Sequence, residues 1–296
     1  MRGGTRELPY TDAPGFRMYY EEQGSGFPLL LINGLGSDHL EWLHQLPAFA
    51  PRFRVVTFDH RGTGKTAVPQ GPYTTARMAD DAAALLGALG IERAHVLGVS
   101  LGGMIAQEVA LRHPDRVEGL VLACTGPGGQ LSVRPSPEAM AAFALSTGED
   151  PEAELRRMIP FLYTDACIRD RPEEIEGFIR RRLAHRTPPE GYAAQLSAAV
   201  THDAASRLER IGARTLVITG DADRLVHWEN SLRLAGRIPG AKLVVLPGAP
   251  HRLFAETAEA FNREVLNFLT PQNRDVPKTP PKQGQTRAFQ HQQSIN

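Results

Sequence analysis

Short apolar runs recur along the chain and predict buried strands: MYYEEQ, PLLLIN, RVVTFD, AHVLGVS, VEGLVLACT, TLVITG and KLVVLPG. Several are nearly continuous in Val, Leu and Ile, which is typical of strands covered on both faces. Between them lie segments with helical spacing, TTARMADDAAALLGALG and the stretch from Ser100 to His113. This alternation predicts an α/β fold with a doubly wound, mostly parallel sheet.

The alternation stops between residues 126 and 205. PSPEAMAAFALS, DPEAELRRMIPFLY, PEEIEGFIRRRLAHR and PEGYAAQLSAAV each indicate a helix, and we count three of them as opened by a proline near the first turn. We therefore expect an α/β core of residues 1–125 and 206–270 with an inserted all-helical cap of residues 126–205. Residues 271–296 are rich in Pro, Gln and charge, which predicts a disordered tail.

Composition narrows the function. The chain has 33 basic and 33 acidic residues, and this balance argues against a nucleic-acid binder. Its two cysteines, Cys124 and Cys167, are too few for a disulfide scaffold and lack metal-ligand spacing. The sequence also has neither H-E-x-x-H nor a His/Asp cluster at ligand spacing, so no metal site is expected. No run approaches the roughly 18 apolar residues of a membrane helix, and no apolar signal segment opens the chain. We expect a cytoplasmic protein with neither a membrane nor a nucleic acid as partner.

The strongest chemical signal is G-x-S-x-G, from Gly98 to Gly102, with a strand before it and an amphipathic helix after it. That context is what a nucleophile elbow requires, because a sharp strand-to-helix turn projects the hydroxyl of Ser100 from the sheet. The alternative is a glycine-rich turn with an incidental serine. Two other motifs fail on spacing: Asp59 stands where a Walker A loop needs glycine, and Ser100 interrupts G-x-G-x-x-G.

A serine hydroxyl needs a base and a group that orients the base. Asp221 and Asp223 follow the strand TLVITG, and His251 follows KLVVLPG. All three lie at the carboxyl ends of predicted strands, on the same sheet edge as Ser100, where open α/β sheets bind ligands. A solvated loop histidine is the alternative interpretation of His251.

Four segments in this order, FDHRGTGKT, GVSLGG, GDADRLV and GAPHRLFAE, resemble the motifs of α/β-hydrolase-fold enzymes over residues 16–270. The resemblance implies Ser100 as nucleophile, His251 as base and Asp223, rather than Asp221, as the acid. It also implies an oxyanion hole made by the backbone N–H groups of Leu35 and Leu101, and no cofactor. Within the family, the chain is most similar to capped bacterial esterases and 3-oxoadipate enol-lactonase-like hydrolases.

The loop LLLINGLGSD departs from the family pattern. Asn33-Gly34 alone favours a hairpin tip, but the following HLEWLHQLPAF has helical spacing. The loop resembles the family's H-G-x-G oxyanion loop, with Asn33 in place of histidine, which leaves its hydrogen-bonding support open. Asn33, His39, Trp42 and Phe254 are candidates to line the substrate pocket; for the last three, core packing or a surface role is at least an equal alternative. Asp59 and Arg61 are expected to form a buried ion pair that shapes the loop, with direct catalysis as the alternative.

The expected function is a cofactor-free carboxylic ester hydrolase that cleaves a small-molecule ester or lactone through an acyl-enzyme. The same triad serves C–C bond hydrolases and perhydrolases, and some proteins of this fold only bind a ligand, so these alternatives stay open. The oligomeric state does not follow from the sequence.

Overall fold

The computed structural model describes residues 9–13, 15–144 and 150–270. In these ranges one eight-stranded sheet has the order β1-β2-β4-β3-β5-β6-β7-β8. Its strands are β1 (Tyr10–Ala13), β2 (Phe16–Gln23), β3 (Phe27–Ile32), β4 (Phe53–Phe58), β5 (Ala94–Val99), β6 (Val117–Ala123), β7 (Arg214–Gly220) and β8 (Lys242–Leu246). The six strands β3 to β8 run parallel to one another, and β2 is antiparallel to both of its neighbours, β1 and β4. The predicted α/β fold is confirmed, and β1 is an additional edge strand.

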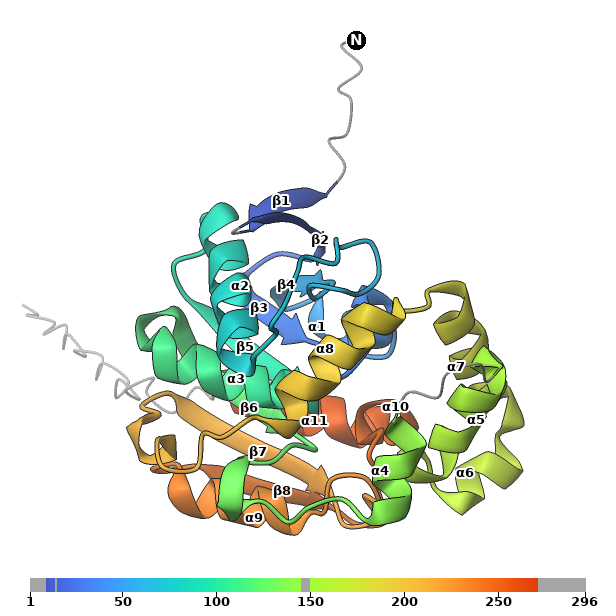
Figure 1. Ribbon diagram of the computed structural model, residues 1–296. Helices are drawn as coiled ribbons and strands as arrows, with labels where there is room; N and C mark the ends of the chain where they lie inside the picture. The colour runs from blue at the N-terminus through green and yellow to red at the C-terminus, as the bar shows by residue number, and fades with distance from the viewer. Residues whose placement is uncertain (1–8, 14, 145–149, 271–296) are drawn as a thin grey trace, which may run out of the picture.

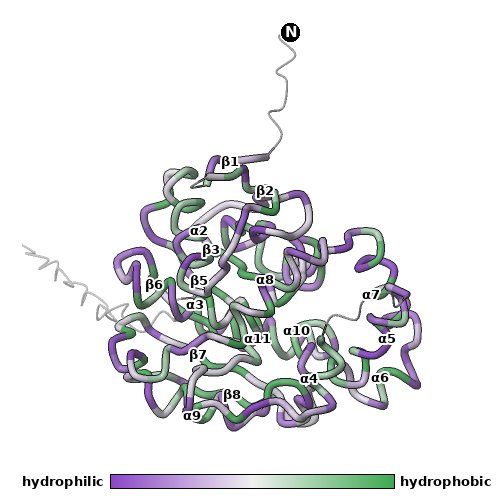
Figure 2. The backbone as a smooth tube through the Cα atoms, viewed as in Figure 1, coloured by the Kyte–Doolittle hydropathy of each residue, from purple (hydrophilic) through white to green (hydrophobic). Residues whose placement is uncertain are grey.

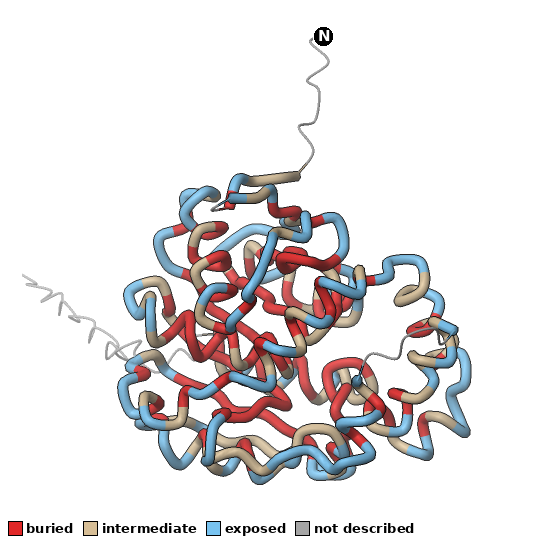
Figure 3. The backbone as a smooth tube through the Cα atoms, in the orientation of Figure 1, coloured by how far each residue is buried: buried red, intermediate tan, exposed pale blue. Residues whose placement is uncertain are grey.

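Helices cover both faces of the sheet (Figure 1). On one face lie α2 (Thr75–Ala88), α3 (Leu101–Arg112) and α9 (Glu229–Arg237); on the other lie α1 (Leu46–Phe49), α10 (Leu253–Glu256) and α11 (Ala258–Leu269). Strand β3 shows why its apolar run is continuous: Leu30 and Ile32 join the first apolar layer, and Leu29 and Leu31 join the second. The apolar strand segments and the buried residues accordingly gather in the middle of the molecule (Figures 2 and 3).

Over the described residues of the inserted cap, the elements are helices, as predicted. Between β6 and β7 lie α4 (Pro137–Phe143), α5 (Pro151–Leu162), α6 (Asp165–Asp170), α7 (Pro172–Ala184) and α8 (Pro189–Val200). Proline begins all four expected helices, and α6 is a short fifth helix. Helices α5 to α8 share an apolar cluster of their own, whereas Ala198 of α8 packs into the sheet core. The cap limits 126 and 205 stay a prediction, and the expected disordered tail, residues 271–296, lies outside the described residues.

Two shorter findings complete the fold. The segment HLEWLHQLPAF forms a 3₁₀ turn, η1 (His39–Trp42), and the short α1 rather than one helix. None of the helices in the described part of the chain is both long enough and apolar enough to cross a membrane.

The turn at Ser100, between β5 and α3, is formed by direct backbone contact. A Cβ at Gly102 would lie 2.1 Å from the carbonyl oxygen of Ile32, and one at Gly98 would lie 2.1 Å from that of Gly102. Only glycine therefore lets α3 approach β5 and the end of β3 this closely. The contact places Ser100 beside the loop that follows β3.

The first prediction concerns this contact. Gly102→Ala should lower the free energy of unfolding by about 1–3 kcal/mol, because the added methyl group overpacks a backbone contact. Gly236→Ala is the matched control: Gly236 is exposed on α9 with nothing within 4 Å of an added Cβ. It should gain up to about 1 kcal/mol from helix propensity. Urea denaturation followed by circular dichroism measures both, and an unchanged Gly102→Ala midpoint would contradict the packing argument.

Candidate active site

Ser100 occupies a sharp turn between β5 and α3. Its backbone has φ 54° and ψ −122°, a conformation that L-residues rarely adopt and that costs on the order of 1–3 kcal/mol. The carbonyl oxygen of Ser100 accepts hydrogen bonds from the Gly103 and Met104 N–H groups and from Thr125 Oγ1, at 2.9, 3.2 and 2.7 Å. Its side chain makes no capping bond to the helix and the residue is partly exposed, so the hydroxyl is available for chemistry.

The candidate base and acid meet at the ends of β7 and β8. His251 Nδ1 lies 2.8 Å from Asp223 Oδ2, and both residues are buried. The other carboxylate oxygen, Oδ1, accepts the N–H groups of Leu225 and Val226 at 2.8 Å each, which fixes the orientation of Asp223. Asp221 instead accepts the Gly248 N–H at 2.5 Å. Of the two aspartates in this loop, Asp223 is therefore the one that contacts the histidine.

Lateral backbone bonds place these loops side by side. Ser100 N–H donates to Ala123, Cys124 N–H donates to Ile218 and Ala222 N–H donates to Ala249, at 3.0 to 3.1 Å. These bonds connect the ends of β5, β6 and β7 with the loop after β8. The three proposed triad residues thus lie on one sheet edge, as the strand order predicts.

The loop after β3 lies directly against the serine. A Cβ at Gly34 would be 3.4 Å from Ser100 Cβ. Ser37 N–H donates to the Gly34 carbonyl at 3.3 Å, and Gly36 has φ +60°, so Gly34 to Ser37 form a turn that needs glycine at its third position. Asn33-Gly34 is consequently not a hairpin tip, and β3 and β4 are parallel.

Two backbone N–H groups beside Ser100 are available for an oxyanion. Leu101 is the first residue of α3, so its N–H has no acceptor within the helix. Leu35 N–H has no acceptor among the residues that the structure describes. Since the Gly34 carbonyl points into the turn toward Ser37, the trans peptide directs Leu35 N–H the opposite way.

Asn33 supports this loop from within the protein. It is fully buried, and its Nδ2 donates to the Phe58 carbonyl at 3.0 Å. His60 Nε2 lies 3.1 Å from the Asn33 carbonyl oxygen; because a carbonyl only accepts, this nitrogen carries the proton. Burial lowers the pKa of His60 to about 4, so the ring is neutral and donates through Nε2. The loop therefore has firm hydrogen-bonding support with asparagine in place of the family histidine.

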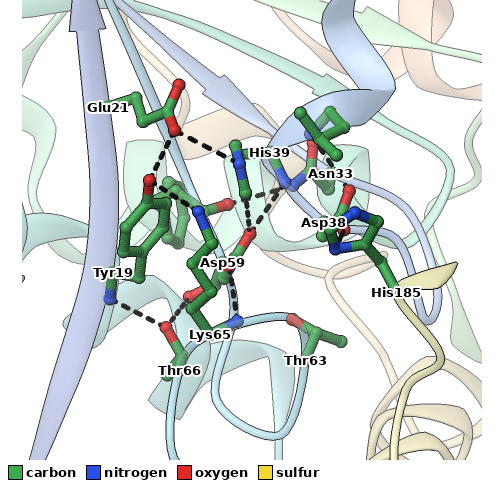
Figure 4. Close-up of polar contacts among 12 residues, drawn as sticks. Tyr19, Glu21, Asn33, Asp38, His39, Asp59, Thr63, Lys65, Thr66 and His185 are labelled. Carbon is green, nitrogen blue, oxygen red and sulfur yellow. Dashed lines mark hydrogen bonds and ion pairs between the residues drawn. The ribbon is translucent and has the colours of Figure 1, made fainter. Parts of the chain in front are cut away.

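His39 belongs to a polar network behind the loop (Figure 4). Its Nδ1 lies 2.8 Å from Asp59 Oδ1 and its Nε2 lies 3.3 Å from Glu21. Burial alone lowers the pKa of His39, but the hydrogen bond to Asp59 and the charges of Asp59 and Glu21 outweigh burial and raise it. Both ring nitrogens thus have protein partners. The predicted Asp59–Arg61 ion pair is wrong. Arg61 Nε and Nη2 instead donate to the carboxylate of Asp81 on α2, at 2.6 and 2.7 Å, while Asp59 binds His39.

The sequence analysis missed polar residues of the cap that bind the loop. Gly36 N–H donates to Gln195 Oε1 at 3.0 Å, and Thr187 Oγ1 donates to the Gly36 carbonyl at 2.8 Å. Arg182 Nη1 donates to Ser37 Oγ at 2.9 Å. One sequence signal could have identified Gln195. It lies at helical spacing between Tyr192 and Ala198, on the buried face of α8, where a polar amide needs hydrogen-bond partners.

Comparison with known proteins agrees with this geometry. The family model described as alpha/beta hydrolase fold matches residues 28–258. The chain belongs to the α/β-hydrolase fold family. The resemblance that the four sequence motifs predicted is therefore confirmed.

This α/β hydrolase is 32% identical to the "Putative carbamate hydrolase RutD" of Azorhizobium caulinodans over 261 residues, which cover 88% of this chain and 98% of that protein. A hydrolase from Pseudomonas aeruginosa is 33% identical with a TM-score of 0.79, covering 90% of this chain and 100% of the other. The enol-lactonase from Burkholderia xenovorans is 31% identical with a TM-score of 0.79, covering 89% and 100%.

In this α/β hydrolase, Arg252, the residue after His251, contacts both the cap and η1. Its guanidinium pairs with Glu41, and its carbon Cζ lies 4.5, 5.1 and 5.4 Å from the ring centroids of Phe178, Phe254 and Tyr163. The Arg252 N–H donates to the Leu162 carbonyl at 3.0 Å. Phe254 and Trp42 were both candidates for the substrate pocket. Their ring centroids lie 5.9 Å apart, in the apolar layer on the α1 and α11 face of the sheet.

The second prediction follows from this buried ion pair. Glu41 and Arg252 side chains are each 7% exposed. Glu41→Gln should lower the free energy of unfolding at pH 7 by about 3–5 kcal/mol, because it leaves the arginine without its carboxylate. Exposed Arg93 and Glu118 form the control pair at 2.8 Å, and Glu118→Gln should cost less than about 1 kcal/mol. Urea titrations of the three proteins give the comparison.

The stabilisation that Glu41 contributes should depend on pH. Burial raises the pKa of Glu41, but the charges of Arg252 and Arg182 and the hydrogen bond to Arg252 outweigh it, so the pKa lies below its usual value. A depressed folded-state pKa contributes stability that is present above the unfolded value, about 4.5, and is lost as the pH falls through the folded value. The difference between wild type and Glu41→Gln should therefore shrink below pH 4.5. A difference that stays constant down to pH 3 would contradict the assignment.

Proposed function

We propose that this α/β hydrolase is a cofactor-free serine hydrolase that cleaves a carboxylic ester or lactone through an acyl-enzyme. The observation that carries the proposal is the buried 2.8 Å contact of His251 with Asp223 on the sheet edge where Ser100 stands in its sharp turn. The relation to an enol-lactonase, at 31% identity over 89% of the chain, supports the lactone class.

In the first half-reaction, Ser100 Oγ attacks the acyl carbonyl carbon while His251 Nε2 takes the hydroxyl proton. Asp223 holds the Nδ1–H tautomer and stabilises the imidazolium that forms. The N–H groups of Leu35 and Leu101 stabilise the oxyanion; each such donor supplies about 3–4 kcal/mol of transition-state stabilisation. When the bond to the leaving oxygen breaks, His251 returns the proton to that oxygen.

In the second half-reaction, water attacks the acyl-enzyme and His251 accepts its proton. Collapse of the second tetrahedral intermediate releases the carboxylic acid and returns the proton to Ser100. With a lactone, the leaving oxygen stays on the acyl chain, so a single hydroxy acid is released.

The surroundings favour a substrate with an apolar portion. Leu35, beside the nucleophile, and Leu225, two residues after the acid, both pack against the apolar cluster of the cap. Met158, Phe178 and Tyr192 contribute to that cluster. Leu35 and Leu225 are themselves partly exposed, so an acyl or ring carbon skeleton bound beside Ser100 would replace water against these two side chains.

A carbamate is the second candidate substrate. The observation that favours it is the relation to proteins named as carbamate hydrolases, which spans 98% of the relative's length. A carbamate carbonyl accepts the same attack by Ser100, and the product on the enzyme is a carbamyl ester. The two candidates therefore share one site and differ only in the group attached to the carbonyl.

The third prediction tests the reaction class. Purified wild-type protein should hydrolyse short p-nitrophenyl esters or γ- and δ-lactones faster than p-nitrophenyl carbamates. Ser100→Ala should lower kcat/KM by at least about 10³-fold, since removal of the nucleophile leaves only binding and oxyanion stabilisation. Stopped-flow absorbance and pH-stat titration measure the panel. No hydrolysis of any ester, lactone or carbamate by wild type would contradict the enzyme proposal, and a preference for carbamates would favour the second candidate.

The fourth prediction separates the two aspartates. Asp223→Asn should lower kcat by about 10⁴-fold, because an amide stabilises neither the required tautomer nor the imidazolium. Asp221→Asn is the control in the same loop; its partner is Gly248 N–H, so kcat should stay within about threefold of wild type. Equal losses in the two variants would show that Asp223 has no distinct role.

A further inference from the structure

The oxyanion loop is held from two sides, by the core and by the cap. On the core side, His60 Nε2 donates to the Asn33 carbonyl at 3.1 Å, which fixes the peptide group between Asn33 and Gly34. On the cap side, Gln195 Oε1 accepts the Gly36 N–H at 3.0 Å, which fixes the peptide group between Leu35 and Gly36. The peptide group that carries Leu35 N–H lies between these two fixed planes. Its own carbonyl, that of Gly34, accepts the Ser37 N–H at 3.3 Å, so its orientation depends on the turn that the two anchors hold in place.

Gln195 connects two loops through hydrogen bonds of its side-chain amide. Its side chain is fully buried on α8, and while Oε1 accepts from Gly36, Nε2 donates to the Arg61 carbonyl at 2.9 Å. The amide thus joins the loop after β3 to the loop after β4, using both of its ends. Close packing of α8 against the second of these loops supports the bridge: a Cβ at Gly191 would lie 2.2 Å from the Gly62 carbonyl oxygen.

A second cap residue holds the same glycine. Thr187, which lies between α7 and α8, donates its hydroxyl to the Gly36 carbonyl at 2.8 Å. A Cβ at Gly36 would lie 2.8 Å from the Tyr192 ring, so α8 covers the turn directly. Both polar groups of the Gly36 backbone are therefore bound by cap side chains.

We propose that Gln195 is a positioning residue of the oxyanion hole, so that the cap holds the catalytic N–H of Leu35 in place. This inference rests on the proposed function, in which Leu35 N–H is an oxyanion donor. Gln195 touches neither the substrate nor the reacting atoms. It acts through Gly36, and the hole is fully aligned only while α8 is docked on the two loops.

The inference predicts a loss confined to the transition state. When the Gly36 N–H has no acceptor, the turn from Gly34 to Ser37 can relax, and the Gly34–Leu35 peptide group that carries Leu35 N–H can tilt away from the position of the oxyanion. The donor matters once negative charge develops on the carbonyl oxygen, so kcat falls while ground-state binding is retained. The loss should be smaller than the 10²–10³-fold effect of removing an oxyanion donor outright.

The fifth prediction uses an isosteric variant. Gln195→Met should lower kcat for the best ester or lactone substrate by about 10- to 100-fold, with KM changed by less than about threefold. The inhibition constant of a trifluoromethyl ketone substrate analogue, which forms a tetrahedral adduct in the hole, should rise by the same factor as kcat falls. The matching methyl ketone, which resembles the ground state, should bind wild type and variant equally.

Gln107→Met is the matched control. Gln107 is also fully buried, and its Nε2 donates to the Gly103 and Gly126 carbonyls at 3.2 and 3.0 Å, away from the oxyanion loop. Its thermal midpoint should fall to a degree comparable with that of Gln195→Met, while the ratio of the two ketone inhibition constants stays at the wild-type value. This ratio separates positioning of the hole from general loss of stability.

If Gln195→Met does not fold, Thr187→Val supplies the test, because it removes only the hydroxyl bond to the Gly36 carbonyl; it should change the ketone ratio in the same direction by a few fold. An active wild type whose variants keep the wild-type kcat and ketone ratio would overturn the positioning role. A wild type that neither turns over substrate nor binds the trifluoromethyl ketone would instead overturn the proposed function, so the two failures are distinguishable.

Discussion

The close approach of α3 to the end of β3 determines the geometry of the candidate site. Gly102 allows the helix backbone to contact the Ile32 carbonyl, and Gly98 allows the following turn to close against α3. The approach places Ser100 beside Gly34 and puts the first N–H of α3 next to the turn that carries Leu35 N–H. A side chain at Gly102 would push α3 away from the end of β3, and one at Gly98 would push α3 away from β5, so the candidate site depends on backbone contacts that only glycine permits.

Around this contact, the loops at the sheet edge are tied to one another and to the cap. Arg252 links the segment after His251 to Glu41 and to cap aromatics, while Glu256 Oε2 accepts the Thr164 N–H at the start of α6. Gln195 and Thr187 hold Gly36 from the opposite end of the cap. The cap is thus part of the framework that orients His251 and the loop after β3. A change in its position would alter the candidate site without any change at Ser100, Asp223 or His251.

Much of the fold could be predicted because parallel strands buried on both faces produce continuous apolar runs, as in LLLI and VLGV. The sequence did not predict the edge strand β1, because this strand is four residues long and only its last residue, Ala13, is buried. Local motifs identified Ser100 and pointed to His251. The partners of Arg61 and Gly36 could not be predicted, since Asp81 arrives on a separate helix and Gln195 lies 159 residues away in the sequence. Such contacts depend on tertiary packing rather than on local pattern.

The central claim is that Ser100 is the nucleophile, activated only in the folded site. The most direct measurement is the intact mass of the protein after reaction with a fluorophosphonate, followed by peptide mapping. The account predicts one phosphonyl group per chain, attached to Ser100, and no labelling of urea-unfolded protein. An unlabelled native protein, or a phosphonyl group on a different serine, would contradict it.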